Sequence, residues 1–332
     1  MREHWNDPIE VGVIGVGKMG RHHARVYNEI PGVRLFGVVD ADESRAEEVA
    51  SAYDARATEI DELLAEVDAA SVAVPTEYHV DAAERCIEHG VDVLVEKPFV
   101  LDRDAGHELV QRADEQDVLI QVGHVERFNP AFEAIADLVE DLSIVALSTR
   151  RLGPPIDRFS SNVIFDLMIH DLDVVREIMD AEVEQIDASG TADGEYATAT
   201  IGFTDGTIAR LTASRATQRK VRTLQITAEE LLADVDYLDR TVELHRQSVP
   251  EYVRSEGGVR FRHEGVVERP MVENGEPLRN ELESFVDSVR TREEPKVTGE
   301  DGLRAVELAE AIHGRAFARG ADAEEPVGVE SE

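Results

Sequence analysis

The stretch Val91–Phe99, which reads VDVLVEKPF, decides the fold of this chain. Its first five residues are apolar apart from one aspartate, which predicts a buried parallel strand. Lys97 follows the end of that strand, and open parallel sheets bind ligands in the crevice outside the carboxyl ends of their strands. Pro98 favours an extended backbone at Lys97, so the Lys97 side chain has a restricted direction. We therefore expect Lys97 at a ligand-binding edge.

Lysine is rare in this chain, which makes its presence at that edge informative. The 332 residues include four lysines against 30 arginines, and 70 acidic residues give a net charge of −36. Such a field repels nucleic acid and anionic membranes, so neither is an expected partner. Acidic excess with scarce lysine is typical of a cytosolic protein from a salt-rich, haloarchaeal cell, where salt screens the self-repulsion.

The remaining bulk features favour a cytoplasmic protein with a reducing environment. No apolar run reaches the roughly 18 residues that a membrane span needs, and the N-terminus MREHWNDP is not a signal peptide. The single cysteine, Cys86, excludes an intrachain disulfide, and it lies in a helical pattern that predicts a core position. No cluster of His, Asp and Glu has convincing metal-ligand spacing, so no metal is expected.

A glycine-rich segment near the N-terminus predicts a dinucleotide site. The strand Ile9–Ile14 leads into a G-x-G-x-x-G loop, and a helix is expected from Arg21 to Ile30. In that context the first glycine permits a tight turn, the second lets a pyrophosphate approach, and the third lets the helix pack on the strand. Asp40 follows the next strand at the spacing of a carboxylate that binds the adenosine ribose. Because it would repel a 2′-phosphate and no arginine follows at once, we expect NAD.

Strands and helices alternate from residue 9 to about residue 123, which predicts a doubly wound parallel sheet. Another strand in it, Ala69–Val74, ends at the same rim as Lys97, beside Pro75 and Thr76. The expected cofactor contacts are Gly15, Gly17, Lys18, Met19, Gly20, Asp40, Pro75, Thr76, His79 and Glu96.

After Gly123 the pattern changes to that of a second domain, α/β in class. A helix over Ala131–Glu140 and a helix over Val163–Met179 accompany about six strands, which predict a mostly antiparallel open sheet. Residues 248–272 are polar and predicted to be irregular. We expect an NAD-binding domain over residues 1–124, a substrate-binding and oligomerisation domain over 125–320 whose last helix packs back on the first, and a disordered acidic tail over 321–332.

Asp166 and His170 are four residues apart in the predicted helix, so they share one face. A surface ion pair would explain them, but a dehydrogenase also needs a group that takes the hydroxyl proton. The pKa of histidine is ordinarily about 6.5, whereas lysine would need a drop of about three units to act as a base at neutral pH. We assign His170 as the base, oriented by Asp166, and Lys97 as a donor to the reacting oxygen. The positive nicotinamide ring would lower the pKa of Lys97, so Lys97 remains an alternative base.

These motifs together resemble the Gfo/Idh/MocA oxidoreductases over roughly residues 8–320. The resemblance is carried by the glycine loop, Pro75-Thr76-x-x-His79, Glu96-Lys97-Pro98, Asp166-x-x-x-His170 and the closing stretch Thr298–Leu303. It implies a Rossmann domain and a second α/β domain whose open sheet forms homodimers or homotetramers. It also implies Lys97, Asp166 and His170 as the catalytic group.

The run from Val122 to Pro130 and the long loop before Asp166 are similar to the branch that acts on UDP-N-acetylhexosamines, where the sugar 3-hydroxyl becomes a ketone. A diphosphate needs cations beyond those that serve NAD. The expected substrate contacts are Arg127, Asn129, Arg150, Arg151 and Arg158. A salt-bridged subunit interface would explain these arginines nearly as well.

Two other functions remain open at the level of the sequence. The first is the same chemistry on a free polyol or sugar, such as inositol, glucose or xylose. The second is a non-catalytic sensor that binds a dinucleotide, although such a protein has no need of an intact lysine, aspartate and histidine set.

Overall fold

The chain folds into two compact units, and the structure, a computed structural model, describes residues 8–155, 162–247, 251–255, 258–262 and 264–317. Unit 1 comprises residues 1–140 and 271–307, and unit 2 comprises 141–270 and 308–332. The predicted NAD-binding domain ends at residue 124, whereas residues 125–140 group with unit 1 as well. The reason is that helix α6 (Pro130–Val139) packs with unit 1, where its Glu133 pairs with Lys296 at 2.9 Å.

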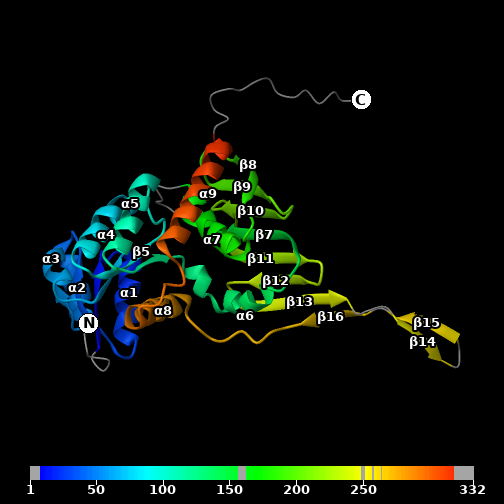
Figure 1. Ribbon diagram of the computed structural model, residues 1–332, viewed down its shortest axis with the longest axis horizontal. Helices are drawn as coiled ribbons and strands as arrows, with labels where there is room; N and C mark the ends of the chain where they lie inside the picture. Colours follow the sequence, from blue (N-terminus) through cyan, green and yellow to red (C-terminus); the bar gives the residue numbers. More distant parts are fainter. Residues whose placement is uncertain (1–7, 156–161, 248–250, 256–257, 263, 318–332) are drawn as a thin grey trace, which may run out of the picture. The chain divides into compact units, whose positions relative to one another are not determined.

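Unit 1 contains a parallel sheet with the strand order β3-β2-β1-β4-β5-β6. The strands of this sheet have blue to blue-green colours in Figure 1. Its strands are β1 (Ile9–Ile14), β2 (Val33–Val39), β3 (Arg56–Ala57), β4 (Ala69–Val72), β5 (Asp92–Glu96) and β6 (Ile120–Gly123). The chain leaves β1 on one side for β2 and returns on the other side at β4, so the strand order reverses between β1 and β4. Ligands of doubly wound sheets bind at this switch point. The predicted doubly wound parallel sheet is confirmed.

Helices cover both faces of this sheet and enclose two apolar cores. One core lies under α1 (Lys18–Glu29), α2 (Glu43–Ala52) and α8 (Pro277–Thr291), and the other lies under α3 (Ile60–Leu64), α4 (His79–Glu88) and α5 (Arg103–Glu115). Cys86 is fully buried in the second core, as predicted. The remaining helical elements of unit 1 are η1 (Thr76–Tyr78), η2 (Val125–Phe128), α6 and the first part of α9 (Gly299–Phe317).

Helix α1 begins at Lys18, three residues before the predicted start at Arg21. Its N-cap is Gly17, so the helix starts inside the glycine motif and not after it. The predicted start is too late because glycine is a poor helix former, so the glycine motif favours a loop up to Gly20. The earlier start brings the helix N-terminus directly against the loop.

Unit 2 contains a sheet with the strand order β16-β13-β12-β11-β7-β10-β9-β8. Its strands are β7 (Ile144–Leu152), β8 (Val183–Gly190), β9 (Tyr196–Phe203), β10 (Ile208–Ser214), β11 (Val221–Ala228), β12 (Leu232–Asp236), β13 (Thr241–Gln247) and β16 (Gly265–Glu268). Only the β7–β10 pair is parallel among these described strands. The prediction of a mostly antiparallel second sheet is confirmed, with eight strands in place of about six.

One local prediction for unit 2 was wrong, and the structure adds a detail to another. The stretch 248–272 is not irregular throughout, since it contributes the hairpin β14 (Glu251–Ser255) and β15 (Gly258–Arg262) as well as β16. The expected helix over Val163–Met179 begins with a π-helical turn, η3 (Ile164–Met168), and continues as α7 (Ile169–Ile178). A π turn adds a residue to one turn of the helix, which apolar periodicity does not reveal.

Two further predictions concern the chain as a whole. Among the described residues, none of the helices combines the length and apolar character that a membrane span requires. The acidic tail predicted over residues 321–332 lies outside the described residues.

Candidate active site

The glycine loop has the backbone geometry that its motif predicts. Gly15 has a φ of +88°, and a Cβ atom there would lie 2.7 Å from the side chain of Val74. A Cβ atom at Gly20 would lie 1.8 Å from the carbonyl oxygen of Gly15, so only glycine lets α1 start this close to the loop. A Cβ atom at Gly17 would meet no described atom within 4 Å, which leaves the approach to the loop open.

This loop fits the pyrophosphate of a dinucleotide. Gly17 has no side chain with which to cap α1, and the first turn of the helix contains no acidic residue among those described. The backbone N–H groups of that turn and the positive end of the helix dipole therefore favour an anion. Lys18 adds a cation, and Met19 is 38% exposed beside it.

Asp40 lies against the same loop, as its spacing predicts, but it has a cationic neighbour that the sequence argument overlooked. Its Oδ2 atom accepts a hydrogen bond of 2.8 Å from the Val16 N–H, and its Oδ1 atom accepts one of 2.9 Å from the Asp42 N–H. The guanidinium of Arg45 is 3.3 Å from the carboxylate. Arg45 partly neutralises Asp40, so the charge of Asp40 alone is a weak argument against a 2′-phosphate.

His79, which is a predicted cofactor contact, is buried between backbone carbonyl groups. It is 1% exposed, its Nδ1 atom faces the carbonyl oxygens of Pro98 and Phe99 at 3.0 and 3.2 Å, and its Nε2 atom faces the Val74 carbonyl oxygen at 3.0 Å. Burial lowers the pKa of His79 more than these carbonyl contacts raise it. We conclude that His79 ties the loop after β4 to the segment after β5. Pro75, by contrast, is exposed, and Thr76 is partly exposed.

Glu96, which is also a predicted cofactor contact, is bonded to other groups of the protein. Its Oε1 atom is 2.9 Å from Nε2 of His23 on α1, and its Oε2 atom accepts a 3.3 Å hydrogen bond from the Lys97 N–H. Burial alone would raise the pKa of Glu96, but the hydrogen bond with His23 and the nearby charges outweigh it and lower that pKa. Glu96 therefore stays ionised and fixes the backbone that carries Lys97, whose own side chain is half-buried.

His124 is a neighbour of Lys97 that sequence reasoning did not single out. It follows β6, the strand that pairs with β5, and it is fully buried. Burial, together with the positive charges of Arg127 and Lys97, lowers the pKa of His124 to about 3. The ring is therefore neutral, and it places no second positive charge beside Lys97.

Arg127 and Asn129, which are predicted substrate contacts, are buried and bonded within unit 1. Arg127 is 3% exposed and donates a 3.2 Å hydrogen bond to the Lys296 carbonyl oxygen. Asn129 is the N-cap of α6, where its side chain accepts a 3.1 Å hydrogen bond from the Ala131 N–H, and it donates another to Glu126. Both side chains are used to fix the turn between β6 and α6.

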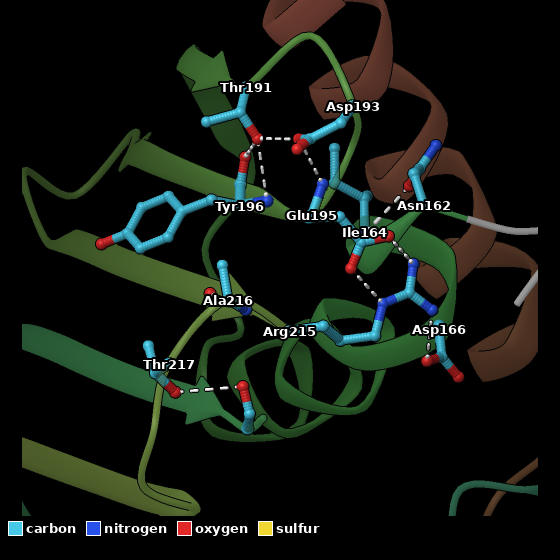
Figure 2. Close-up of polar contacts among 12 residues, drawn as sticks. Asn162, Ile164, Asp166, Thr191, Asp193, Glu195, Tyr196, Arg215, Ala216 and Thr217 are labelled. Carbon is cyan, nitrogen blue, oxygen red and sulfur yellow. Dashed lines mark hydrogen bonds and ion pairs between the residues drawn. The ribbon is translucent and has the colours of Figure 1, made fainter. Parts of the chain in front are cut away.

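Asp166 and His170 lie on consecutive turns of one helical segment in unit 2, with Asp166 in η3 and His170 in α7. The described contact of Asp166 is an ion pair of 3.2 Å with Nη1 of Arg215, drawn in Figure 2. Arg215 is 3% exposed and lies just after β10. The sequence analysis missed this arginine entirely.

The arginines predicted to bind the substrate are dispersed. Arg151 is 1% exposed and forms a bidentate ion pair with Asp171, from 2.8 Å, which fixes α7 on β7. Neighbouring residues of a strand point to opposite faces, so Arg150 is exposed on the sheet face away from α7. That position does not support a contact with a ligand of His170. Arg158 lies outside the described residues.

The described residues thus form two sets, each within its own unit. Unit 1 gathers the glycine loop, Pro75, Thr76 and Lys97 at the carboxyl edge of its parallel sheet, and unit 2 presents Asp166 and His170 on one helix. A phosphate loop at the switch point of a doubly wound sheet, with a lysine at the same edge, defines a dinucleotide-dependent oxidoreductase.

Comparison with known proteins identifies the family. Residues 9–124 match the family model described as "Oxidoreductase family, NAD-binding Rossmann fold", and residues 146–231 match the "GFO/IDH/MocA C-terminal domain". The chain belongs to the Gfo/Idh/MocA family of oxidoreductases and has its NAD-binding Rossmann domain.

Relatives in this family act on sugars and polyols. UDP-N-acetylglucosamine 3-dehydrogenase from Acidithiobacillus ferrooxidans is 34% identical over 307 residues, covering 91% of this chain and 95% of that protein. Its solved structure matches with a TM-score of 0.84, covering 93% of this chain and 98% of that chain. Inositol 2-dehydrogenase from Rhizobium meliloti is 27% identical over 321 residues, covering 91% and 95%.

Proposed function

We propose that this oxidoreductase oxidises the 3-hydroxyl of a UDP-N-acetylhexosamine to a ketone. The observation that carries the proposal is the likeness to UDP-N-acetylglucosamine 3-dehydrogenase along nearly the whole chain. The conserved chemistry is the loss of a hydride and a proton from one CH–OH group. NAD, when bound at the glycine loop, accepts the hydride.

In this proposal the catalytic residues are Lys97, Asp166 and His170. His170 takes the hydroxyl proton, because an imidazole has an ordinary pKa of about 6.5 and needs no large shift to do so. The ammonium group of Lys97 donates a hydrogen bond to the reacting oxygen and stabilises its alkoxide character. Asp166 orients the base. The fixed backbone around Lys97, held by Glu96 and His79, supports its role, since a positioned donor is worth more than a mobile one.

The test is NADH formation, followed at 340 nm, with UDP-N-acetylglucosamine set against free inositol, glucose and xylose. We expect turnover of the nucleotide sugar, and we expect Lys97→Met and His170→Asn each to lower kcat by roughly 10²- to 10⁴-fold. Lys296→Met is the matched control, because Lys296 pairs with Glu133 at the surface of unit 1 and has no assigned role in the reaction. A His170→Asn enzyme with near-full kcat would remove His170 as the base.

A free polyol is the second candidate substrate, and the likeness to inositol 2-dehydrogenase supports it. The dispersal of Arg127, Arg150 and Arg151 leaves Arg158 as the predicted diphosphate contact, which weakens the arginine argument for a nucleotide sugar. Turnover of a free sugar or polyol alone would decide for this candidate. Nucleotide binding without turnover of any substrate would decide for a sensor.

We also infer a cytoplasmic, haloarchaeal setting and a homodimer or homotetramer. The net charge of −36 supports the setting. A polar open sheet face supports an oligomer: Ser148, Arg210 and Gln225 lie in one row across β10, β7 and β11 on the face away from α7. Light scattering after size-exclusion chromatography in molar KCl tests the oligomer, and a monomer there would contradict it.

A further inference from the structure

Arg215 is the centre of a buried ion-pair network in unit 2, shown in Figure 2. Its Nη1 atom contacts Oδ2 of Asp166 at 3.2 Å, while its Nε and Nη2 atoms contact the two carboxylate oxygens of Glu195 at 3.0 and 3.2 Å. The Arg215 N–H also donates a 2.9 Å hydrogen bond to the Glu195 carbonyl oxygen. One guanidinium therefore joins two carboxylates from separate elements, and both of its edges are engaged.

Hydrogen bonds within the β8–β9 loop fix the backbone of Glu195 independently of Arg215. Thr191 donates to Oδ1 of Asp193 at 2.6 Å, and the same oxygen accepts the Glu195 N–H at 3.1 Å. The Tyr196 N–H donates to the Thr191 hydroxyl at 3.1 Å, which closes the loop at the start of β9. Glu195 thus has a fixed backbone although its side chain is 37% exposed.

The same loop also supports the start of the helical segment that carries Asp166. The Val163 N–H donates to the Gly194 carbonyl oxygen at 3.0 Å, and the Asn162 side chain accepts the Ile164 N–H at 2.9 Å. Asp166 is therefore held at its backbone by this capped start and at its carboxylate by Arg215.

We propose that Arg215 is a positioning residue that acts through Asp166, with Glu195 as its fixed anchor. The proposal rests on the proposed function, in which Asp166 orients the base. Arginine remains protonated at any working pH, so Asp166 keeps this partner while His170 gains and loses its proton. A bidentate contact with Glu195 sets the plane of the guanidinium, and the plane in turn sets where the Asp166 carboxylate lies.

The experiment combines single and double variants of the full-length enzyme. We expect Arg215→Met to lower kcat at least about 30-fold with less than about a threefold change in KM, because the interaction positions a catalytic group and does not bind substrate. The double variant with Asp166→Asn should be no slower than Asp166→Asn alone, since residues that act as one unit are not additive. Added guanidinium should restore part of the kcat of Arg215→Met.

Three controls keep the outcomes distinct. Arg246→Met removes an exposed pair with Glu268 in the same unit and should leave kcat unchanged. If Arg215→Met does not fold, as judged by circular dichroism, Arg215→Lys and Glu195→Gln carry the test, and each should lower kcat with little change in KM. An unaltered rate in Asp166→Asn would instead contradict the proposed function itself.

Two results would overturn the proposal for Arg215 alone. One is a lowered kcat in Asp166→Asn together with a wild-type kcat in the Arg215 variant. The other is a double variant whose loss is the product of the two single losses, with no rescue by guanidinium.

Discussion

At the scale of single residues, three buried histidines lie next to the segment that carries Lys97, and their surroundings differ. His23 pairs with Glu96, His79 faces backbone carbonyl oxygens, and His124 lies near the charges of Arg127 and Lys97. Each ring fixes backbone or excludes water close to the lysine. A lysine that is held in place in this way can present its ammonium group in one direction.

The pKa of His124 gives a prediction for stability against pH. The folded protein binds a proton at His124 only near pH 3, whereas the unfolded chain binds one near the ordinary pKa of 6.5. Between these values the unfolded state carries more protons, so stability rises with pH and is lost as pH falls. In His124→Gln, the slope of the unfolding free energy against pH should fall by up to about 1.4 kcal/mol per pH unit between pH 6 and pH 4.

Urea unfolding at constant KCl measures that slope. His107→Gln, at an exposed position on α5, serves as the matched control and should keep the wild-type slope. Equal slopes in wild type and His124→Gln would show that this ring does not contribute to acid unfolding.

Residues that depend on backbone geometry were predictable from the sequence, and residues that depend on distant partners were not. Gly15, Gly20 and Lys97 follow from local motifs at strand ends. The roles of Arg151 and Arg215 depend on carboxylates elsewhere in the chain: Asp166 is 49 positions from Arg215, and Glu195 is 20. A sequence shows that a charge is present, but it does not show which opposite charge the fold brings to it.

At the scale of elements, the π-helical turn η3 is the feature that periodicity could not predict. It lies between the capped start of the segment and α7, and it includes Asp166. Single π turns occur often at functional sites, where the extra residue re-aims side chains. Most other strand and helix bounds agree with the sequence within a few residues, whereas β14, β15 and β16 were missed because their stretch is polar.

Deletion of Leu167 tests whether this turn sets the catalytic geometry. One residue fewer between Asp166 and His170 rotates one against the other by about 100° on an α-helix. We expect the deletion to lower kcat at least about 100-fold, because a misdirected base loses its orientation. Leu167→Ala keeps the spacing and should retain most of the activity. A deletion variant that folds and keeps wild-type kcat would mean that the spacing of these two residues is irrelevant.

At the scale of the whole molecule, the charge balance dominates. Some surface carboxylates pair with arginine, such as Glu48 with Arg21 and Glu84 with Arg112. The net charge is nevertheless −36. The hydrogen bond from Arg21 lowers the pKa of Glu48. Acidic residues outnumber basic residues in the whole chain. The negative charges of the folded state therefore repel one another until salt screens them.

Thermal unfolding against salt follows from this balance. Between about 0.1 M and about 2 M KCl we expect the Tm to rise by at least about 5 °C, since the Debye length falls from about 10 Å to a few ångströms. A sucrose series of equal osmolarity separates screening from general exclusion of solutes, and it should raise the Tm less. A Tm that does not change with KCl would contradict the salt-rich setting.

The division of unit 1 into two chain segments has a consequence for biosynthesis. Phe285 of α8 is buried in the core under α1, and Leu303 of α9 is buried in the core beside α5, yet both follow residues 141–270 of unit 2 in the chain. A nascent chain that has emerged only as far as residue 140 therefore lacks α8 and the start of α9, which complete the two cores of its nucleotide-binding sheet. The cores of unit 1 are complete only after the ribosome has synthesised these last helices. The amino-terminal part of unit 1 therefore reaches its native structure only after the carboxyl-terminal part has been made.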